Sequence, residues 1–313
     1  ITYTMQIVMS FLMLTMISVM LPRAGVAAGR IEEVIGTRPS VTDREQVQDE
    51  KLRSAKGVVS FEDVSFRYPG ADEDALENLT FTAGPGETTA VIGSTGCGKS
   101  TLLNLIPRFY DVTAGRITID GVDIRDLSQH KLRSLLGYVP QKAVLFSGDI
   151  ASNLKFGGTW QDGASDITDS SMEEAARIAQ ATEFIESKTE KYHSGISQGG
   201  TNVSGGQKQR LSIARAIAKS PKIYLFDDSF SALDYKTDVT LRRALREKTG
   251  DATVIIVAQR ISTILNADRI IVLDDGKIAG MGTHRELLRE CEAYREIARS
   301  QLSEAELKGG AAV

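Results

Sequence analysis

The segment from Gly93 to Ser100, GSTGCGKS, limits the possible folds of this chain more than any other feature. It follows an apolar run, Thr88 to Ile92, and precedes an expected helix over Lys99 to Leu105. Its spacing is that of a phosphate-binding loop, whose backbone N–H groups curl around phosphate oxygens at a helix N-terminus. In such a loop the lysine contacts the β- and γ-phosphates, and the serine hydroxyl ligates Mg²⁺. A plain glycine-rich turn would not require this strand and helix, so we predict a nucleotide-binding α/β domain.

A second apolar run, Ile223 to Phe226, ends at the carboxylate of Asp227. A buried strand would hold this carboxylate rigidly at the Mg²⁺ shell, either directly or through water. Many strands end in aspartate, so the run alone is weak evidence. Together with the phosphate-binding loop, it predicts ATP and Mg²⁺ as the cofactors.

Strand and helix signals alternate from Val58 onward, which is typical of an α/β domain with a central, mainly parallel sheet. A strand pair around a turn at Asp120 and Gly121 predicts an additional antiparallel β subdomain. Between Asp149 and Ala218 the strand signal fades, which predicts a helical insert. Its clearest helices are Ser171 to Ala181 and Gln207 to Ala218. The other expected elements are strands at Val58 to Phe66, Thr88 to Ile92, Ile223 to Phe226, Thr253 to Val257 and Ile270 to Leu273, and a helix pair from about His284.

The N-terminal segment, Ile1 to Leu21, contains no Asp, Glu, Lys or Arg. As a helix it would be about 31 Å long, close to the hydrocarbon thickness of a bilayer. It lacks the basic start and cleavage site of a signal peptide and does not begin with Met, which predicts a fragment of a larger protein. Arg23 and Arg30 favour a cytoplasmic location for its C-terminal side. A buried core helix is the alternative.

These patterns divide the chain into four expected parts. Residues 1–35 are a membrane helix with a cytoplasmic extension, 36–57 a polar linker, 58–305 the nucleotide-binding domain with a helical subdomain at about 149–218, and 306–313 a tail expected to fray. The net charge of −4 argues against nucleic acid as a partner, which would need a basic face. Cys97 and Cys291 cannot form a disulfide framework, which favours a cytosolic main body.

The run VSGGQKQRLSIARA, which starts at Val203, closely resembles the signature motif and following helix of ABC ATPases. The resemblance extends from Val58 to about Leu302 and implies a P-loop NTPase fold of the ABC ATPase type. Two cassettes of this family sandwich two ATP molecules head to tail, and each signature closes over the γ-phosphate held by the other cassette. The residues that would contact the partner's ATP are Ser204, Gly205, Gly206 and Gln207.

Three further positions have family roles by resemblance. Tyr68 in FRYPG lies where the family places an aromatic ring that stacks on adenine. Gln141 in YVPQKAVLF matches the Q-loop, which in the family senses the γ-phosphate and Mg²⁺ and touches the membrane domains. The run Ser231 to Asp234 matches the D-loop, which crosses between the two cassettes.

The segment LPRAGVAAGRIEEVI, from Leu21, resembles the end of the sixth transmembrane helix in ABC exporters that carry membrane and ATPase domains on one polypeptide. The resemblance implies an ATPase coupled to transmembrane transport, integral in the cell membrane, with its nucleotide-binding domain on the cytoplasmic side. Its expected neighbours are the lipid bilayer, the rest of its own membrane domain and a second ABC half-transporter. A soluble cassette ATPase without transport is the alternative, and it requires Ile1 to Leu21 to be a core helix.

Three positions depart from the family pattern. Asp228 stands where the family usually has the glutamate that acts as general base, and its side chain is one C–C bond shorter. Gln259 stands where the family has a switch histidine, and glutamine cannot carry a positive charge or shuttle a proton. Gln198 replaces a glutamate common in exporters.

Together these departures resemble the degenerate-site subunit of a heterodimeric, multidrug-type exporter. Its own site would bind ATP and turn it over slowly, while its intact signature would complete the efficient site on the partner. A homodimer with low turnover at both sites and a mainly regulatory ATP-binding module remain as alternatives.

The predicted site residues fall into three groups. The catalytic group is Asp228, Gln259, Gln141 and Lys99. The residues expected to contact the nucleotide are Tyr68, Gly93, Ser94, Thr95, Gly96, Cys97, Gly98, Lys99, Ser100, Thr101, Gln141 and Asp227. The expected metal ligands are Ser100, Gln141 and Asp227.

Overall fold

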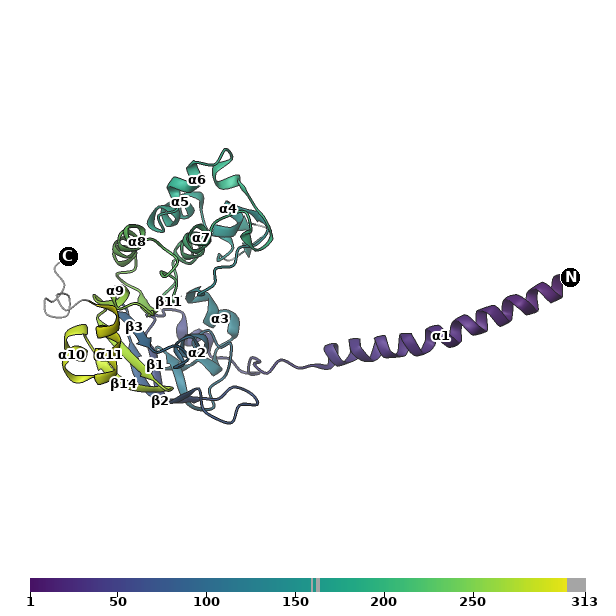
Figure 1. Ribbon diagram of the computed structural model, residues 1–313, viewed down its shortest axis with the longest axis horizontal. Helices are drawn as coiled ribbons and strands as arrows, with labels where there is room; N and C mark the ends of the chain where they lie inside the picture. Colours follow the sequence, from purple (N-terminus) through teal and green to yellow (C-terminus); the bar gives the residue numbers. More distant parts are fainter. Residues whose placement is uncertain (159, 162–163, 303–313) are drawn as a thin grey trace. The chain divides into compact units, whose positions relative to one another are not determined.

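A computed structural model describes residues 1–158, 160–161 and 164–302 of the chain (Figure 1). The chain separates into two compact units, one over residues 1–42 and the other from residue 43 onward. The expected tail, 306–313, and the last residues of the expected nucleotide-binding domain, 303–305, lie outside the described residues.

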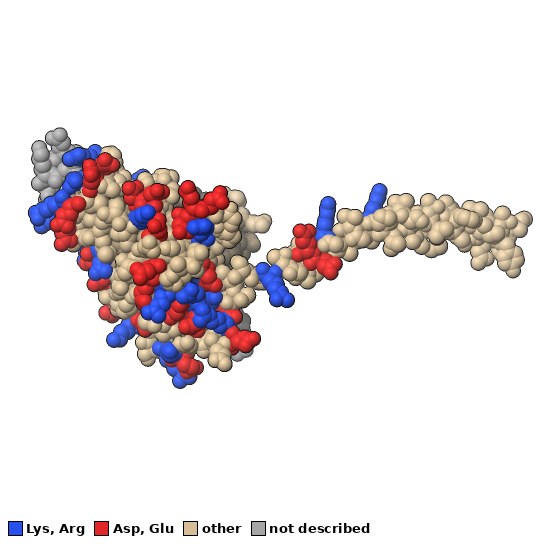
Figure 2. Space-filling model, turned by 90° about the horizontal axis from the view of Figure 1, so that it is seen from below, with Lys and Arg blue, Asp and Glu red and all other residues tan. Residues whose placement is uncertain are grey.

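The first unit consists mainly of one helix, α1 (Thr2–Gly36), which continues through Pro22. By length and composition it could cross a membrane, since its most apolar window has a mean hydropathy of 1.9 and none of that window is buried. The hydroxyls of Ser10, Thr15 and Ser18 donate to carbonyl oxygens four residues earlier, at 2.9, 2.9 and 2.8 Å. These polar side chains are therefore satisfied within the helix, as a lipid environment requires. In Figure 2 the N-terminal stretch of α1 carries no acidic or basic side chain.

The second unit is built around a six-stranded sheet with the order β14-β13-β3-β12-β11-β6. All neighbours are parallel except β14, which pairs with β13 in the antiparallel sense. Every residue of β11 and of β12 is buried, as expected for β-branched and apolar runs covered on both faces. The strands are β3 (Thr88–Gly93), β6 (Leu136–Val139), β11 (Ile223–Asp227), β12 (Thr253–Val257), β13 (Arg269–Asp274) and β14 (Lys277–Gly282). The predicted mainly parallel sheet is confirmed.

A second, antiparallel sheet has the order β2-β1-β4-β5. Its strands are β1 (Val59–Phe66), β2 (Leu76–Ala83), β4 (Ala114–Ile119) and β5 (Val122–Asp123). The turn between β4 and β5 has positive φ at Asp120 (49°) and Gly121 (80°), the geometry that an aspartate-glycine hairpin turn needs. The predicted antiparallel subdomain is therefore confirmed.

The helical insert contains α4 (Ile150–Lys155), α5 (Asp169–Ile178), α6 (Thr182–Glu186) and α7 (Gly205–Ala218). Two two-stranded ribbons accompany these helices, β7 (Gly148–Asp149) with β10 (Gly195–Ile196) and β8 (Trp160–Gln161) with β9 (Ala164–Ser165). Buried residues of the insert share one apolar cluster with residues of the large sheet, so the insert packs as part of the domain.

The remaining helices complete the second unit. They are α2 (Lys99–Leu105), α3 (Gln129–Ser134), α8 (Tyr235–Lys248), α9 (Ile261–Ile264), α10 (His284–Glu290) and α11 (Glu292–Gln301). Figure 2 shows acidic and basic side chains interspersed over the visible face of this unit.

The second half of the expected linker packs on the nucleotide-binding domain. Leu52 is only 1% exposed and belongs to the core beneath the antiparallel sheet. The Asp49 carboxylate accepts hydrogen bonds from the backbone N–H and the hydroxyl of Ser128, at 2.9 and 2.6 Å. Asp120 in turn accepts from the backbone N–H groups of Gly57 and Val58, at 3.1 and 2.9 Å. These contacts attach the middle and the C-terminal end of the 43–57 segment to the domain.

Candidate nucleotide-binding site

The residues predicted for ATP binding follow strands that end level with one another. The pairing register sets Val257 opposite Val91 and Asp227, and Phe226 opposite Val139. The carboxyl ends of β3, β12, β11 and β6 therefore meet at one edge of the sheet, the usual position of a ligand site in a parallel α/β sheet. The loops that begin there carry Gly93 to Gly98, Gln259, Asp228 and Gln141.

The loop between β3 and α2 has the backbone of a phosphate cradle. Gly96 and Gly98 have φ of 89° and 96°, a region that side chains other than glycine rarely adopt. A Cβ on Gly98 would lie 2.6 Å from Leu76 Cδ2, and one on Gly93 would lie 2.6 Å from Cys97 Sγ. A Cβ on Gly96 would meet nothing within 4 Å, so this part of the loop opens to solvent. Glycine is thus required by close packing at the two ends and by conformation at the middle.

Lys99 is held inside this loop. Its side chain is 8% exposed, and its Nζ donates to the carbonyl oxygens of Gly93 and Ser94 at 2.9 and 2.6 Å. Cys97, which is also buried, has its Sγ 3.6 Å from the same Nζ. An ammonium group aimed into a loop of N–H donors makes a binding site for anionic oxygens. This donor set fits the phosphates of a nucleotide.

Ser100 and Asp227 come together from α2 and β11. The Ser100 hydroxyl donates to Asp227 Oδ1 at 2.9 Å. Burial raises the pKa of the Asp227 carboxyl, and the neighbouring Asp228 carboxylate raises it further, while Ser100 and Lys99 act in the opposite direction. A carboxylate held in this environment is stabilised by an added cation, and a hydroxyl beside it supplies a second oxygen ligand. The chemistry of this pair fits Mg²⁺, and its role as a metal site stays a prediction.

Asp228 occupies a constrained position next to Gln141. Its backbone has a φ of 44°, and its side chain is largely buried. Gln141 Nε2 lies 3.4 Å from Asp228 Oδ2, a long hydrogen bond that joins the ends of β6 and β11. The Asp228 N–H donates to Val257 O at 2.9 Å. The backbone of Asp228 is therefore tied to β12, and its carboxylate to the residue that follows β6 by two positions.

Ser229 also positions this edge, although the sequence analysis did not single it out. It is fully buried, and its hydroxyl lies 2.9 Å from Val139 O and 3.2 Å from Asp227 O. The contact ties the turn after β11 to the end of β6. A small hydroxyl residue after two aspartates was the only available signal, and that signal is not specific.

The family profile described as ABC transporter matches residues 76–231, which include the phosphate-binding loop, Gln141, the signature run and Asp227. The structure is similar to a solved structure, "Structure of a bacterial Atm1-family ABC exporter with ATP bound". The two have a TM-score of 0.81 and 35% sequence identity, over 91% of this chain and 48% of that chain. The chain contains an ABC transporter ATP-binding domain of the exporter type.

Curated relatives agree with this membership. An uncharacterized ABC transporter ATP-binding protein of Mycobacterium tuberculosis is 47% identical over 98% of this chain and 52% of the relative. The ATP-dependent lipid A-core flippase of Haemophilus influenzae is 39% identical over 84% of this chain and 45% of the relative. The chain thus spans about half the length of these relatives.

Tyr68 lies beside the ABC nucleotide site, in the loop after β1. Its hydroxyl is 2.9 Å from the Thr101 hydroxyl on α2, the helix that follows the phosphate-binding loop. Its ring meets Phe66 and Tyr110 edge to face, with centroids 4.8 and 5.3 Å away. The structure therefore brings Tyr68 and Thr101 together beside the phosphate-binding loop, and their contact with a nucleotide stays a prediction.

The last predicted catalytic residue, Gln259, lies in the short segment between β12 and α9 and is exposed. Its backbone carbonyl oxygen accepts a hydrogen bond from Gln301 Nε2 at 2.8 Å. The sequence placed Gln259 in the loop after this strand, but it gave no indication of a contact with the C-terminal helix.

The ABC signature lies at the start of α7. Ser204 and Gln207 form a capping box, in which the Ser204 hydroxyl accepts from Gln207 N at 3.3 Å and the Ser204 N–H donates to Gln207 Oε1 at 3.0 Å. A Cβ on Gly205 would meet nothing within 4 Å, so that backbone is open to solvent. The next residue, Gly206, approaches the D-loop, because its Cβ would lie 3.3 Å from Ala232 O. The first-turn N–H groups of α7 therefore face outward at an exposed helix start.

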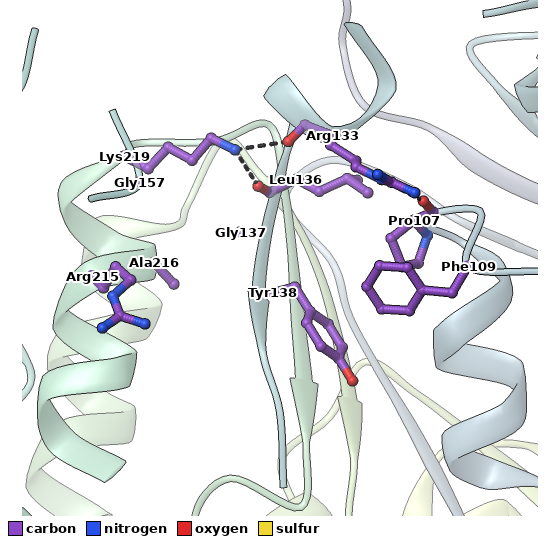
Figure 3. A pocket seen from close by; sticks show the side chains of 10 residues that line it. All are labelled: Pro107, Phe109, Arg133, Leu136, Gly137, Tyr138, Gly157, Arg215, Ala216 and Lys219. Atoms are coloured by element: carbon purple, nitrogen blue, oxygen red, sulfur yellow. Dashed lines mark hydrogen bonds between the residues drawn. The ribbon is translucent and has the colours of Figure 1, made fainter. Parts of the chain in front are cut away.

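A separate cavity of about 220 Å³ lies beside β6 (Figure 3). Lys219 Nζ closes one side by donating to the carbonyl oxygens of Arg133 and Leu136, at 2.7 and 2.8 Å. Opposite it, the Phe109 and Tyr138 rings meet edge to face with centroids 5.8 Å apart. Burial and Asp227 raise the Tyr138 pKa to about 12, so its hydroxyl stays neutral. The lining residues are Pro107, Phe109, Arg133, Leu136, Gly137, Tyr138, Gly157, Arg215, Ala216 and Lys219, none of which was predicted for the ATP site.

Proposed function

We propose that this chain is the ATP-binding and ATP-hydrolysing part of an ABC exporter. The observation that carries the proposal is the shared sheet edge, where Lys99, the Ser100–Asp227 pair and Asp228 are held by the ends of neighbouring strands. The similarity to an exporter with ATP bound, and to a flippase described as ATP-dependent, supports the assignment.

In this proposal α1 is the last helix of the membrane domain and its cytoplasmic extension, over residues 1–35. Residues 36–57 link it to the nucleotide-binding domain at 58–305, which works on the cytoplasmic side of the cell membrane. The length, composition and internally bonded hydroxyls of α1 support this division. Gln141 follows β6, which forms a wall of the cavity in Figure 3, and we expect contacts with the membrane domain to reach the ATP site through that strand.

The residues at the sheet edge would divide the chemistry among them. Lys99 exchanges the loop carbonyl oxygens for oxygens of the β- and γ-phosphates, while the loop N–H groups hold the same phosphates. Ser100 and Asp227 would hold Mg²⁺, which would supply positive charge that neutralises the phosphates. Asp228 accepts a proton from the attacking water at a carboxylate oxygen, and the Gln259 side chain donates to the γ-phosphate.

The exposed signature supports a second proposal, that two cassettes close head to tail. Ser204, Gly205, Gly206 and Gln207 serve no phosphate in this chain's own loop, and their helix start faces solvent. A helix N-terminus with open backbone N–H groups attracts an anion. We assign it to ATP held on the phosphate-binding loop of a partner cassette.

We further propose that this chain's own site is the slow site of a heterodimer. Asp228 has a side chain one C–C bond shorter than glutamate, and displacement on that scale lowers a reaction rate by about a hundredfold. Gln259 cannot supply positive charge at the γ-phosphate. Both substitutions fall on hydrolysis, whereas the groups that bind the nucleotide are intact. A homodimer with low turnover at both sites, or ATP acting mainly to regulate dimerisation, are the alternatives.

The test compares hydrolysis by the unmodified protein with hydrolysis by Asp228→Glu combined with Gln259→His. Single-turnover ATP hydrolysis and vanadate trapping of nucleotide on this chain should rise by about a hundredfold in the double variant. The same pair of substitutions in a Lys99→Ala background is the control and should remain inactive. Fast hydrolysis by the unmodified chain in the absence of any partner would remove the slow-site proposal.

A further inference from the structure

The segment that carries Gln259 is short and weakly capped. Only residues 258–260 separate β12 from α9, and α9 itself is four residues long. Arg260 precedes α9 and provides no side-chain cap, so the first N–H of that helix, at Ile261, needs a partner from elsewhere. The carbonyl oxygen of Gln259 likewise needs a donor.

A single side chain from the C-terminal helix satisfies both groups. Gln301, the last residue of α11, donates from Nε2 to Gln259 O at 2.8 Å. Its Oε1 accepts from Ile261 N at 2.9 Å. Because a carbonyl can only accept and an N–H can only donate, this orientation of the amide is the one that satisfies both partners. The planar amide thus bridges two positions of the segment in the manner of a neighbouring strand.

The helix that presents Gln301 is firmly anchored. Tyr294 and Ala298 of α11 are fully buried, and Ala298 lies one turn before Gln301. The Tyr294 hydroxyl is 2.7 Å from His284 Nδ1 on α10, which fixes the two C-terminal helices to each other. Gln301 therefore projects from a helix that is fixed to the domain.

Other contacts hold the segment on either side of this bridge. Ala258 N donates to Val91 O of β3 at 3.1 Å, before Gln259. After Ile261, the Arg242 guanidinium on α8 donates to Ser262 O and Thr263 O, at 3.2 and 3.0 Å. The two bonds from Gln301 lie between these contacts, at Gln259 and Ile261. The backbone there sets the direction of the Gln259 side chain.

We infer that Gln301 is a positioning residue for Gln259, so that the C-terminal helix sets the geometry of the switch position. The inference rests on the proposed ATPase function of this edge. A charged histidine would be drawn toward phosphate by Coulomb attraction, but the neutral Gln259 amide lacks that force and depends on its backbone being in place. The contact acts on the hydrolytic step and leaves the phosphate-binding loop unchanged.

The experiment uses the protein in lipid nanodiscs with the cassette that co-purifies with it, in an Asp228→Glu background in which hydrolysis is expected to be fast enough to follow. Three variants are compared: Gln301→Ala, which removes both bonds, Gln301→Glu, which keeps an acceptor for Ile261 N but loses the donor to Gln259 O, and Ser300→Ala as the control. Within the part of the chain that the structure describes, the Ser300 hydroxyl bonds only inside α11, to Ile297 O at 2.7 Å. Vanadate trapping with a photoreactive ATP analogue reports turnover on this chain.

We expect Gln301→Ala and Gln301→Glu each to lower the trapping rate about tenfold, with KM and nucleotide affinity within twofold of the parent. Hydrogen exchange at Ile261 should quicken in the alanine variant and stay slow in the glutamate variant. Ser300→Ala should match the parent in every measurement. The glutamate variant decides the question, because it keeps the acceptor for Ile261 N and loses only the donor to Gln259 O. It also keeps the test valid if the alanine variant folds poorly.

A parental rate in Gln301→Glu would show that Gln301 only caps α9, and the inference would be overturned. Parental rates in both Gln301 variants would overturn it equally. A Lys99→Ala and Asp227→Ala double variant, measured in parallel, separates this result from the proposed function. If that double variant still bound nucleotide, the ATP-site assignment itself would be wrong, whatever Gln301 does.

Discussion

Two helices of this domain begin beside glycines, and they are built in opposite ways. At α2 the preceding Gly98 is packed against Leu76 and Ala75, and Lys99 is buried against its own loop. At α7 the preceding Ser204 is exposed, Gly205 has open space around it, and the cap closes only on Gln207. The first site obtains its lysine, and the Ser100–Asp227 pair proposed to hold Mg²⁺, from its own chain. The second offers first-turn N–H groups and the Ser204 hydroxyl without a lysine, which fits its proposed role as the complement of a site on a partner cassette.

The largest effect should come from the self-contained site. Lys99→Ala combined with Asp227→Ala removes the cation proposed to bind phosphate and the carboxylate proposed to bind Mg²⁺. Each charged hydrogen bond contributes about 1.5–3 kcal/mol, so affinity for Mg²⁺·ATP should fall by more than about a hundredfold. Equilibrium binding of a fluorescent ATP analogue measures it. Ser204→Ala, at the other helix, should leave this affinity unchanged, and an equal loss there would contradict the contrast.

The two glycines give the sharpest matched comparison. Gly98→Ala places a Cβ at a φ of 96° and 2.8 Å from Ala75 O, so we expect a loss of about 2 kcal/mol of stability or more and loss of nucleotide binding. Gly205→Ala meets no atom within 4 Å in a helical first turn, and stability should rise by about 0.5 kcal/mol. Thermal unfolding of both variants checks this. Equal destabilisation would mean that the start of α7 is not open.

Ser204→Ala tests the exposed helix start by itself. Loss of the capping box should lower the free energy of unfolding by about 1 kcal/mol. Because the cap is remote from this chain's own loop, nucleotide affinity should stay constant while turnover on the partner cassette falls. Urea unfolding gives the first quantity and chain-resolved vanadate trapping the second. Unchanged turnover on the partner would argue against a signature that acts across the interface.

The sequence predicted the elements that carry the candidate site well where residues close in the chain suffice. The phosphate-binding loop and the strand before Asp227 are contiguous runs with strong local patterns. The predicted start of α7 at Gln207 was two residues late, because Gly205 and Gly206 form its first turn behind the Ser204 cap. The sequence analysis missed the strand β2, although apolar and polar residues alternate along much of it. The strand is irregular, because Asn78 has a φ of 52° and the register with β1 shifts around Leu79.

Other elements lacked a local signal. The strand β6 has four residues, including Gly137, and its burial comes from β11 beside it. The edge strand β14 contains two glycines, and its residues alternate between exposed and half-buried positions, with none fully buried. In α8, buried Leu241 and Leu245 are separated by charged residues. The contact of Gln301 with Gln259 depends on how α11 returns to the sheet edge, which no short-range pattern encodes.

The smallest expected effect is a pH dependence that belongs to the self-contained site alone. Burial and Asp228 raise the pKa of Asp227, so a proton competes with Mg²⁺ at higher pH than at an ordinary aspartate. Affinity for Mg²⁺·ATP should therefore weaken on acidification, beginning above the ordinary range for aspartate. Calorimetric titrations over a pH series measure this, and Asp227→Asn, which cannot titrate, should show a flatter profile.

The same shift predicts the opposite sign for stability without nucleotide. The folded state binds the Asp227 proton more tightly than the unfolded state does, so between the ordinary pKa and the raised one, falling pH stabilises the fold. Lowering pH through this window should thus raise the free energy of unfolding of the parent relative to Asp227→Asn, while it weakens nucleotide binding. Urea unfolding of both proteins over the pH series gives the difference. The contrary result would be that acidification lowers both the free energy of unfolding and the nucleotide affinity in the parent alone. A carboxylate other than Asp227 would then have to control binding, and the Asp227 charge would not be buried as the structure has it.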